Sequence, residues 1–199
     1  MLAMFRQGHW MKENVRIADN TAKAAKESAE AAQKSAEAAT ATIKIMKRTA
    51  RRQLRARVFV VTAQRLEQCL PRRFTAELTI KNFGGVPAYG CTFRAHMSLM
   101  TNPLGGAEIP KLHVSGQEAN LVLPPGAEVR TRLYLPQGGF EQNQHNLVTA
   151  GSYAVYIHGE IHYRDGFGKH CASTFLMRCG GLEYATGRFS FCERGNTAN

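Results

Sequence analysis

The first quarter of the chain carries a repeat of small and apolar residues at alternating steps of three and four. No Gly or Pro interrupts residues 11–56. A sustained period of 3.5 residues is typical of a helix in a left-handed coiled coil. The pattern therefore predicts an Ala-rich helix over 11–56 that associates with copies of itself through residues 11–50. Its seam is formed by Met11, Val15, Ala18, Ala22, Ala25, Ala29, Ala32, Ala36, Ala39, Ile43, Met46 and Ala50.

The apolar face of this predicted helix is broad. A row of Ser and Thr lies beside the seam, and a row from Ile17 to Ile45 with three alanines lies beyond it, while charged residues occupy the opposite arc. So wide a face suits a bundle, or helices with two neighbours, better than a two-stranded zipper. The alternative is a lone helical spacer, because each alanine buries little apolar area and intrinsic helix propensity is already high.

After residue 57 the period of the pattern changes to two, which indicates β-strands. A hairpin is predicted where two such stretches flank Arg164-Asp165-Gly166-Phe167-Gly168-Lys169. Short strands at this spacing predict an antiparallel β-sandwich of about six to eight strands. The expected strands are 58–63, 74–82, 88–100, 128–135, 153–163 and 170–178, and one helical turn is expected within 137–150.

The predicted organisation has four parts: residues 1–10 are a flexible N-terminus, 11–56 the coiled-coil helix, 57–194 the β-sandwich domain and 195–199 a frayed tail. The residues beyond Leu182 are expected to cover one sheet edge. The start of the chain lacks a signal peptide's apolar region, and no apolar run reaches about 18 residues. We therefore expect a soluble, cytoplasmic protein or one that is peripherally associated with a membrane.

Positive charge is concentrated in the predicted helix. Residues 1–57 hold 13 Lys and Arg against 5 Asp and Glu, whereas the remainder holds 13 against 10. This basic run is either a solvated helix end that suits the helix dipole, or a stripe that contacts anionic lipid. Contact with nucleic acid is disfavoured, because no aromatic residues for base stacking accompany the run. The run comprises Lys44, Lys47, Arg48, Arg51, Arg52, Arg55 and Arg57, and a single helical stripe contains Lys44, Arg48, Arg51 and Arg55.

One predicted strand carries the most conspicuous polar face. Tyr156, His158, Glu160 and His162 alternate along it, and His170 starts the partner strand. We expect the first four to form an interaction surface for a protein partner that the sequence does not identify. Imidazole and carboxylate groups are also zinc ligands, so a metal site is an alternative, although tetrahedral sites usually draw ligands from more than one element. Its candidates are His158, Glu160, His162 and His170.

No catalytic motif accompanies these residues. The Asp165-Gly166-Phe167-Gly168 turn lacks the other motifs of a kinase, and neither Gly-Gly pair has the ending of a phosphate-binding loop. The sequence therefore indicates a protein that is not an enzyme and uses no cofactor. Buried, reduced thiols are expected because no cysteine pair has metal or redox spacing, and a disulfide between Cys91 and Cys171 is the alternative in an exported protein. The cysteines are Cys69, Cys91, Cys171, Cys179 and Cys192.

The order of these features resembles a group of uncharacterised bacterial membrane-anchored proteins. The matching stretches are the coil from Ala22 to Ala39, Asn82-x-Gly-x-x-Pro-Ala88, and Gly159-Glu-Ile-His-Tyr-Arg-Asp-Gly-Phe-Gly168 with His170, Thr174 and Phe175. The resemblance implies an immunoglobulin-like domain attached to the inner membrane, and it brings no catalytic residues. The N-terminal span of those proteins is missing from this sequence.

Three functions are carried forward from these patterns. The first is a non-enzymatic interaction or scaffold protein, in which a membrane-proximal coiled-coil oligomer presents the immunoglobulin-like domain. The second is a phage virion or other assembly component that uses the same two parts as a structural element. The third is a metal-binding protein that uses the His cluster of the sandwich.

Overall fold

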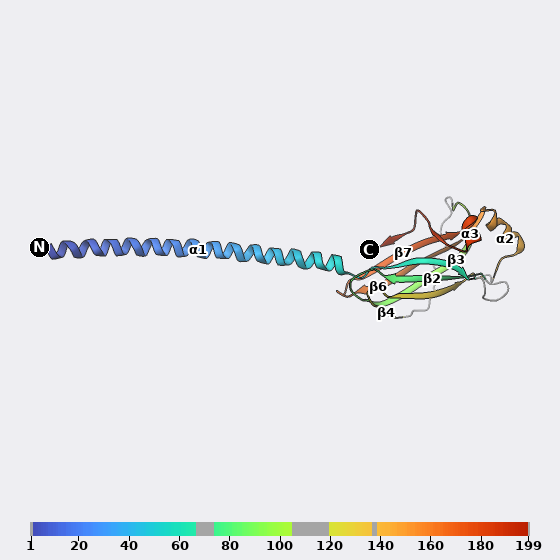
Figure 1. Cartoon of the computed structure of the whole chain (residues 1–199), viewed down its shortest axis with the longest axis horizontal. Helices are drawn as coiled ribbons and strands as arrows, with labels where there is room; N and C mark the ends of the chain where they lie inside the picture. The colour runs from blue at the N-terminus through green and yellow to red at the C-terminus, as the bar shows by residue number, and fades with distance from the viewer. Residues whose placement is uncertain (1, 67–73, 105–119, 137–138, 199) are drawn as a thin grey trace. The chain divides into compact units, whose positions relative to one another are not determined.

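A computed structural model of the chain describes residues 2–66, 74–104, 120–136 and 139–198, with side chains from Trp10 onward. The chain divides into two compact units, Met1–Arg52 and Gln53–Asn199. The first is helical and the second is built mainly from strands (Figure 1). The predicted fold class, a long helix followed by an antiparallel β-sandwich, is confirmed.

Helix α1 spans Leu2–Leu54. The helix therefore includes Leu2 to Trp10 of the predicted N-terminal segment, because Leu, Ala, Met, Arg and Gln are good helix formers and a single Gly at position 8 does not stop the helix. That this segment is flexible remains a prediction. The helix ends two residues before the predicted boundary at 56. There the carbonyl of Leu54 accepts a hydrogen bond from the Gly85 N–H at 3.0 Å, which draws the chain toward the sandwich.

The sandwich consists of two antiparallel sheets. The smaller sheet has the order β1-β2-β5, and the larger has the order β4-β3-β6-β7-β8, with β9 also paired to β7. The smaller sheet contains β1 (Val58–Leu66), β2 (Thr75–Asn82) and β5 (Glu128–Tyr134). The larger contains β3 (Ala88–Thr101), β4 (Leu121–Leu123), β6 (Tyr153–Asp165), β7 (His170–Cys179), β8 (Ser190–Phe191) and β9 (Thr197–Ala198).

The hydrophobic core lies between the two sheets, since alternate residues of each strand point into it. Val58 and Leu78 enter from the smaller sheet, and Ile157, Ile161 and Met177 enter from the larger one; all five are at most 2% exposed. Two short helices lie in the segments just before β6 and just after β7. They are α2 (Gln142–Thr149), which buries Val148, and α3 (Leu182–Thr186), which buries Tyr184.

The six predicted strands all form, with boundaries that differ by a few residues. The helical turn expected within 137–150 is α2, and the residues beyond Leu182 pair with the edge of β7 as expected. The prediction of a frayed tail over 195–199 is wrong for Thr197–Ala198, which form β9. The side chains of Thr174 and Thr197 lie 2.7 Å apart there, and the Asn196 amide oxygen accepts the Leu176 N–H at 3.0 Å.

Within the described parts of the chain, no helix combines the length and the apolar character that crossing a bilayer requires.

Candidate functional site

The predicted interaction surface lies on the outer face of the larger sheet. In β6, Val155, Ile157 and Ile161 point into the core, so the intervening Tyr156, His158, Glu160 and His162 point away from the smaller sheet. The structure therefore confirms that these four residues share a face. It also shows that the two halves of this face differ in exposure.

The half of the face at Tyr156 is closed. Tyr156 is 1% exposed and packs in a small cluster with Ala154 and Leu176, against which Cys192 also lies. The segment after β8 covers this cluster, because the Cys192 N–H donates to the Leu176 carbonyl at 2.9 Å. The phenolic oxygen of Tyr156 lies 3.2 Å from the Asn102 amide oxygen. The prediction that Tyr156 faces a partner is wrong for this structure, since the chain's own C-terminal segment takes that place.

His158 is also removed from the surface. It is 6% exposed, and its ring meets the ring of His96 on β3 edge to face, with centroids 5.5 Å apart. The two are direct cross-strand neighbours in the β3–β6 register. The prediction that His158 belongs to a partner-binding surface is therefore also wrong for this structure, because its side chain is buried. The signal for this pairing was the polar alternation Arg94-x-His96-x-Ser98, but the partner strand of β3 could not be read from the sequence.

The other half of the face is polar and partly exposed. Glu160 lies 3.1 Å from His162 Nε2 and 3.5 Å from Arg94 Nη1, so one carboxylate contacts a side chain on each strand. The His162 side chain is 47% exposed and the Glu160 side chain 27%. These two are the predicted interaction residues that remain accessible.

The four metal-ligand candidates do not converge. Among the described residues, no group of three or more His, Cys, Asp or Glu side chains is arranged to hold a metal ion. Alternate residues of one strand are roughly 6.6 Å apart, whereas zinc requires each ligand within about 2.2 Å of one point. His170 lies opposite Arg164 in the β6–β7 register, and His162 lies opposite Ala172.

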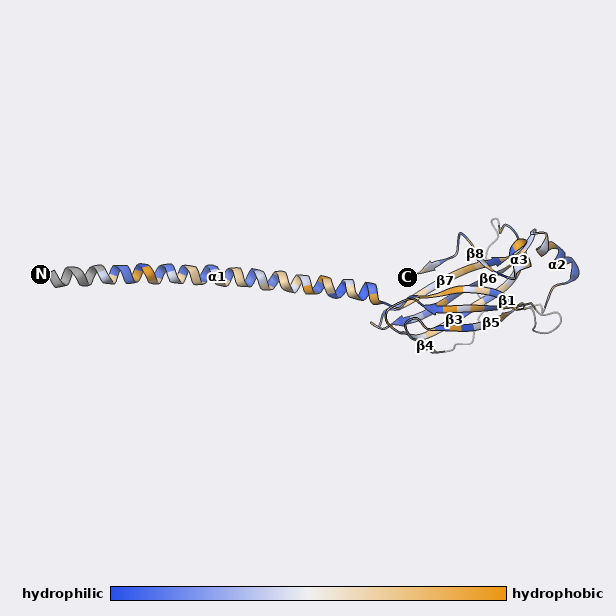
Figure 2. Cartoon of the chain, in the orientation of Figure 1, coloured by the Kyte–Doolittle hydropathy of each residue, from blue (hydrophilic) through white to orange (hydrophobic). Residues whose placement is uncertain are grey.

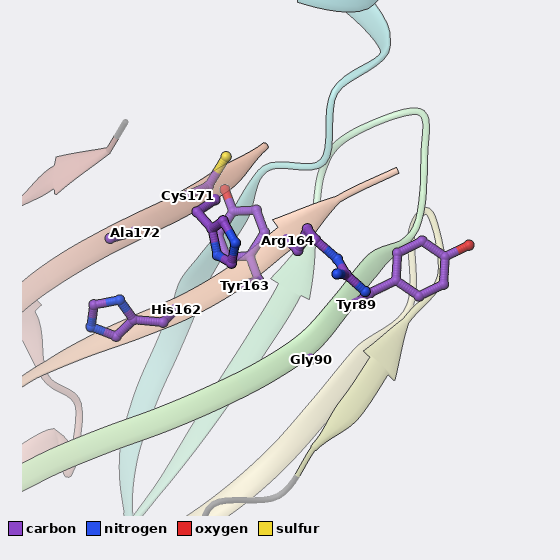
Figure 3. A pocket seen from close by; sticks show the side chains of 8 residues that line it. Tyr89, Gly90, His162, Tyr163, Arg164, Cys171 and Ala172 are labelled. Carbon is purple, nitrogen blue, oxygen red and sulfur yellow. The ribbon is translucent and has the colours of Figure 1, made fainter. Parts of the chain in front are cut away.

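A depression of 340 Å³ adjoins His162 on this outer face (Figure 3). Arg164 and Tyr89 are register partners on β6 and β3, and their side chains lie next to each other. Gly90, with a φ of +58°, sits in a β-bulge between Tyr89 and Thr92, where the strand leaves the regular register. The depression is lined by Tyr89, Gly90, His162, Tyr163, Arg164, His170, Cys171 and Ala172.

The chemistry of this depression suits binding better than catalysis. Arg164 offers guanidinium donors, and His162 and His170 offer imidazole groups, so the lining can donate to an anionic or oxygen-rich group. The one thiol in the lining is not an activated nucleophile. Burial, and then the negative charge of Asp165, raises the pKa of Cys171, so the thiol stays protonated at neutral pH.

The remaining described cysteines have the same character. No disulfide joins Cys91 to Cys171, because the described cysteines are all free thiols: Cys91, Cys171, Cys179 and Cys192. The fifth cysteine of the sequence, Cys69, lies outside the described residues. Burial raises the pKa of Cys91 and of Cys192, and raises that of Cys179 from 9.0 to about 12. Buried thiols with raised pKa values are inert, which is typical of packing residues.

The basic run is divided by the end of α1. Lys44, Lys47, Arg48, Arg51 and Arg52 are exposed on its last turns, where cations suit the helix dipole. Arg55 and Arg57 lie beyond the helix, in the segment that leads into β1. The predicted stripe of Lys44, Arg48, Arg51 and Arg55 therefore keeps its first three members on α1 and loses Arg55.

Comparison with known families assigns residues 19–180 to a family described as a domain of unknown function, DUF8453. The match covers most of the chain, and the protein therefore belongs to this family. It extends from within α1 to just beyond β7, so helix and sandwich both fall inside it, whereas the C-terminal segment that covers β7 lies outside. Neither the curated proteins nor the solved structures gave a match.

Proposed function

We propose that this chain is a non-enzymatic interaction protein, in which α1 associates with α1 of other copies and gathers several β-sandwich domains into one particle. One observation carries the proposal: every residue from Trp10 to Leu54 is exposed in the single chain. The exposed side chains include Val15 at 62%, Ile45 at 66% and Met46 at 64%. A helix with so many exposed apolar side chains gains free energy when another surface covers them.

The distribution of these side chains along α1 supports association with an identical helix. Hydrophobic residues recur along the coloured part of α1, from Trp10 onward (Figure 2). The large ones gather toward its two ends, at Met11, Val15 and Ile17 and again at Ile43, Ile45 and Met46, and alanine fills the seam between them. Alanine lets two helix backbones approach closely, so dispersion contacts add to a burial term of about 0.8 kcal/mol per CH₂ or methyl group.

The chain offers a matched pair of substitutions for testing this proposal. Ala39 lies on the seam, and Ala41 lies two residues further on the opposite arc; both are exposed in the single chain. A glutamate on the seam would bury an unpaired carboxylate between the two helices, and this lowers the free energy of association. A loss of more than about 1.4 kcal/mol makes association more than tenfold weaker. We therefore expect Ala39→Glu to weaken self-association at least tenfold in sedimentation equilibrium, and Ala41→Glu to leave it unchanged.

Two results contradict the proposal. The first is a wild-type protein that light scattering finds monomeric at high concentration. The second is an equal effect of Ala39→Glu and Ala41→Glu, which would mean that the seam is not the contact. The first result would make α1 a lone spacer, and the second would place any contact on another surface.

A further inference from the structure

One end of the sandwich, here called the basal end, is built from four segments: residues 55–57, 83–87, 124–127 and 166–169. Strand register brings them together. Val58 pairs with Asn82, Lys81 with Glu128, and Ala88 with both Leu123 and Asp165. A Cβ on Gly84 would lie 2.1 Å from the Arg55 carbonyl, and one on Gly166 would lie 3.0 Å from Val86, so the segments are packed against one another.

Two buried polar side chains fix the basal end. Asn82 is fully buried; its amide oxygen accepts the N–H groups of Arg57 and Gly84, and its amide nitrogen donates to the carbonyls of Val86 and Leu123. Asp165, 3% exposed, accepts the N–H groups of Phe167 and Lys169 within the hairpin turn. The turns are thereby held in place before any ligand arrives.

The surface of this end combines cations with aromatic rings. Arg57, Arg164 and Lys169 are exposed, and among the described residues no salt bridge involves them. The two acidic groups here are both engaged, Asp165 with the turn and Glu128 with Lys81 at 2.8 Å. Phe83 is 56% exposed, Phe167 44% and Tyr89 39%.

We propose that the basal end binds the surface of an anionic phospholipid bilayer. Phe83 and Phe167 enter the interfacial layer from two neighbouring turns, and Arg57, Arg164 and Lys169 lie among the phosphates. Exposed Phe side chains bury their apolar rings at the boundary between head groups and acyl chains, and each cation near an anionic leaflet adds about 1 kcal/mol. The depression beside Tyr89 and Arg164 gives a phosphate group a place next to this surface.

The ring contacts favour lipid over nucleic acid as the occupant. Stacking of a base requires a free aromatic face. The Phe83 ring is already tilted against Phe59 at 6.3 Å, and Lys81 Nζ lies 5.7 Å from its centroid. A ring flanked in this way can still insert into an apolar layer, with its ammonium neighbour at the head groups.

The test is flotation of the full chain with phosphatidylcholine vesicles that contain about one third phosphatidylglycerol. We expect binding to these vesicles and not to pure phosphatidylcholine. Arg164→Gln with Lys169→Gln should weaken binding about 30-fold, since two cations contribute about 1 kcal/mol each. Phe83→Ser with Phe167→Ser should weaken it at least about tenfold.

Matched controls lie away from the basal end. Arg132→Gln with Arg188→Gln removes the same charge, and Tyr134→Ser with Leu182→Ser removes two exposed apolar side chains; both should bind as wild type does. Lys47→Gln with Arg48→Gln reports what α1 contributes. Thermal melts show that each variant is folded, and light scattering on the same samples scores self-association separately.

Several outcomes overturn the proposal. If the wild-type protein binds both kinds of vesicle equally, charge plays no role in binding. If only the Lys47 and Arg48 variant loses binding, the lipid contact belongs to α1. Loss of binding in the Arg164 and Lys169 variant without any loss in the phenylalanine variant identifies a general polyanion site, for which an oligonucleotide would compete.

Discussion

In α1, Val15, Ile45 and Met46 are between 62% and 66% exposed, whereas in the sandwich Val58, Leu78 and Ile157 are fully buried. Both regions repeat apolar residues at the period of their secondary structure. The strands find a covering layer in the opposite sheet of the same chain, and α1 finds none within its own compact unit. The stability of the sandwich should therefore be a property of one chain, and that of α1 a property of the number of chains.

The largest effect on the sandwich is expected from Asn82→Ala. The change leaves the N–H groups of Arg57 and Gly84 and the carbonyls of Val86 and Leu123 without their side-chain partner. Because unpaired buried polar groups cost about 1–3 kcal/mol each, the free energy of unfolding should fall by about 3 kcal/mol. Urea denaturation followed by the near-ultraviolet circular dichroism of tyrosine measures it.

Asn146→Ala is the control for this prediction, since Asn146 is exposed on α2. It should change the free energy of unfolding by less than about 0.5 kcal/mol. A loss below about 1 kcal/mol in Asn82→Ala would show that the basal end is not held by this side chain.

The next prediction concerns α1 and its dependence on concentration. If a second helix covers the seam, a hundredfold increase in protein concentration stabilises the pair of helices by about 2.7 kcal/mol per dimer through mass action. The helical transition in far-ultraviolet circular dichroism should then move to higher temperature, and the sandwich transition should not. If neither transition temperature depended on protein concentration, the contrast between helix and sandwich would be removed.

A smaller effect on the sandwich is expected from Gly159→Ala. A Cβ at this position would lie 2.5 Å from the Arg94 carbonyl oxygen and 2.5 Å from the Phe175 ring, which stacks on Phe93. Overpacking of this kind costs about 2 kcal/mol. The loss should appear in urea denaturation of the sandwich, while sedimentation equilibrium of α1 stays as in wild type; unchanged stability would mean that the ring moves away freely.

The same contrast explains what could be predicted from the sequence. The 3.5-residue period specifies α1 because its pattern depends on neighbours within one helix. The pattern that predicts each strand also depends on residues close in sequence, but the pairing of strands depends on residues far apart in sequence. Nothing near His158 in the sequence shows that His96 faces it, and nothing near Tyr156 shows that Cys192 lies over it.

The basal end illustrates this limit. Asn82, Asp165 and Phe83 belong to turns that the sequence marks plainly, yet their common role depends on the register of β2, β3 and β6. The site on β6 was predicted from the alternation along one strand. That prediction identified residues that share a face, but it could not include the C-terminal segment that covers half of this face. The predicted immunoglobulin-like topology and the coiled coil remain predictions.

The last prediction uses pH to separate the two regions. Burial raises the pKa of Cys179 from 9.0 to about 12, and it also raises the pKa values of Tyr163 and Tyr184. In the unfolded chain these groups lose their protons at lower pH, so their contribution to stability is full below pH 9 and is lost as pH rises toward 12.

Cys179 alone accounts for at most about 1.4 kcal/mol per pH unit in this range. Cys179→Ala should therefore flatten the fall in the sandwich's free energy of unfolding between pH 9 and 12, measured by urea denaturation at each pH. Residues 2–54 contain no Cys or Tyr, so self-association through α1 should not weaken by this route. A parallel alkaline loss of both transitions would contradict the independence of helix and sandwich.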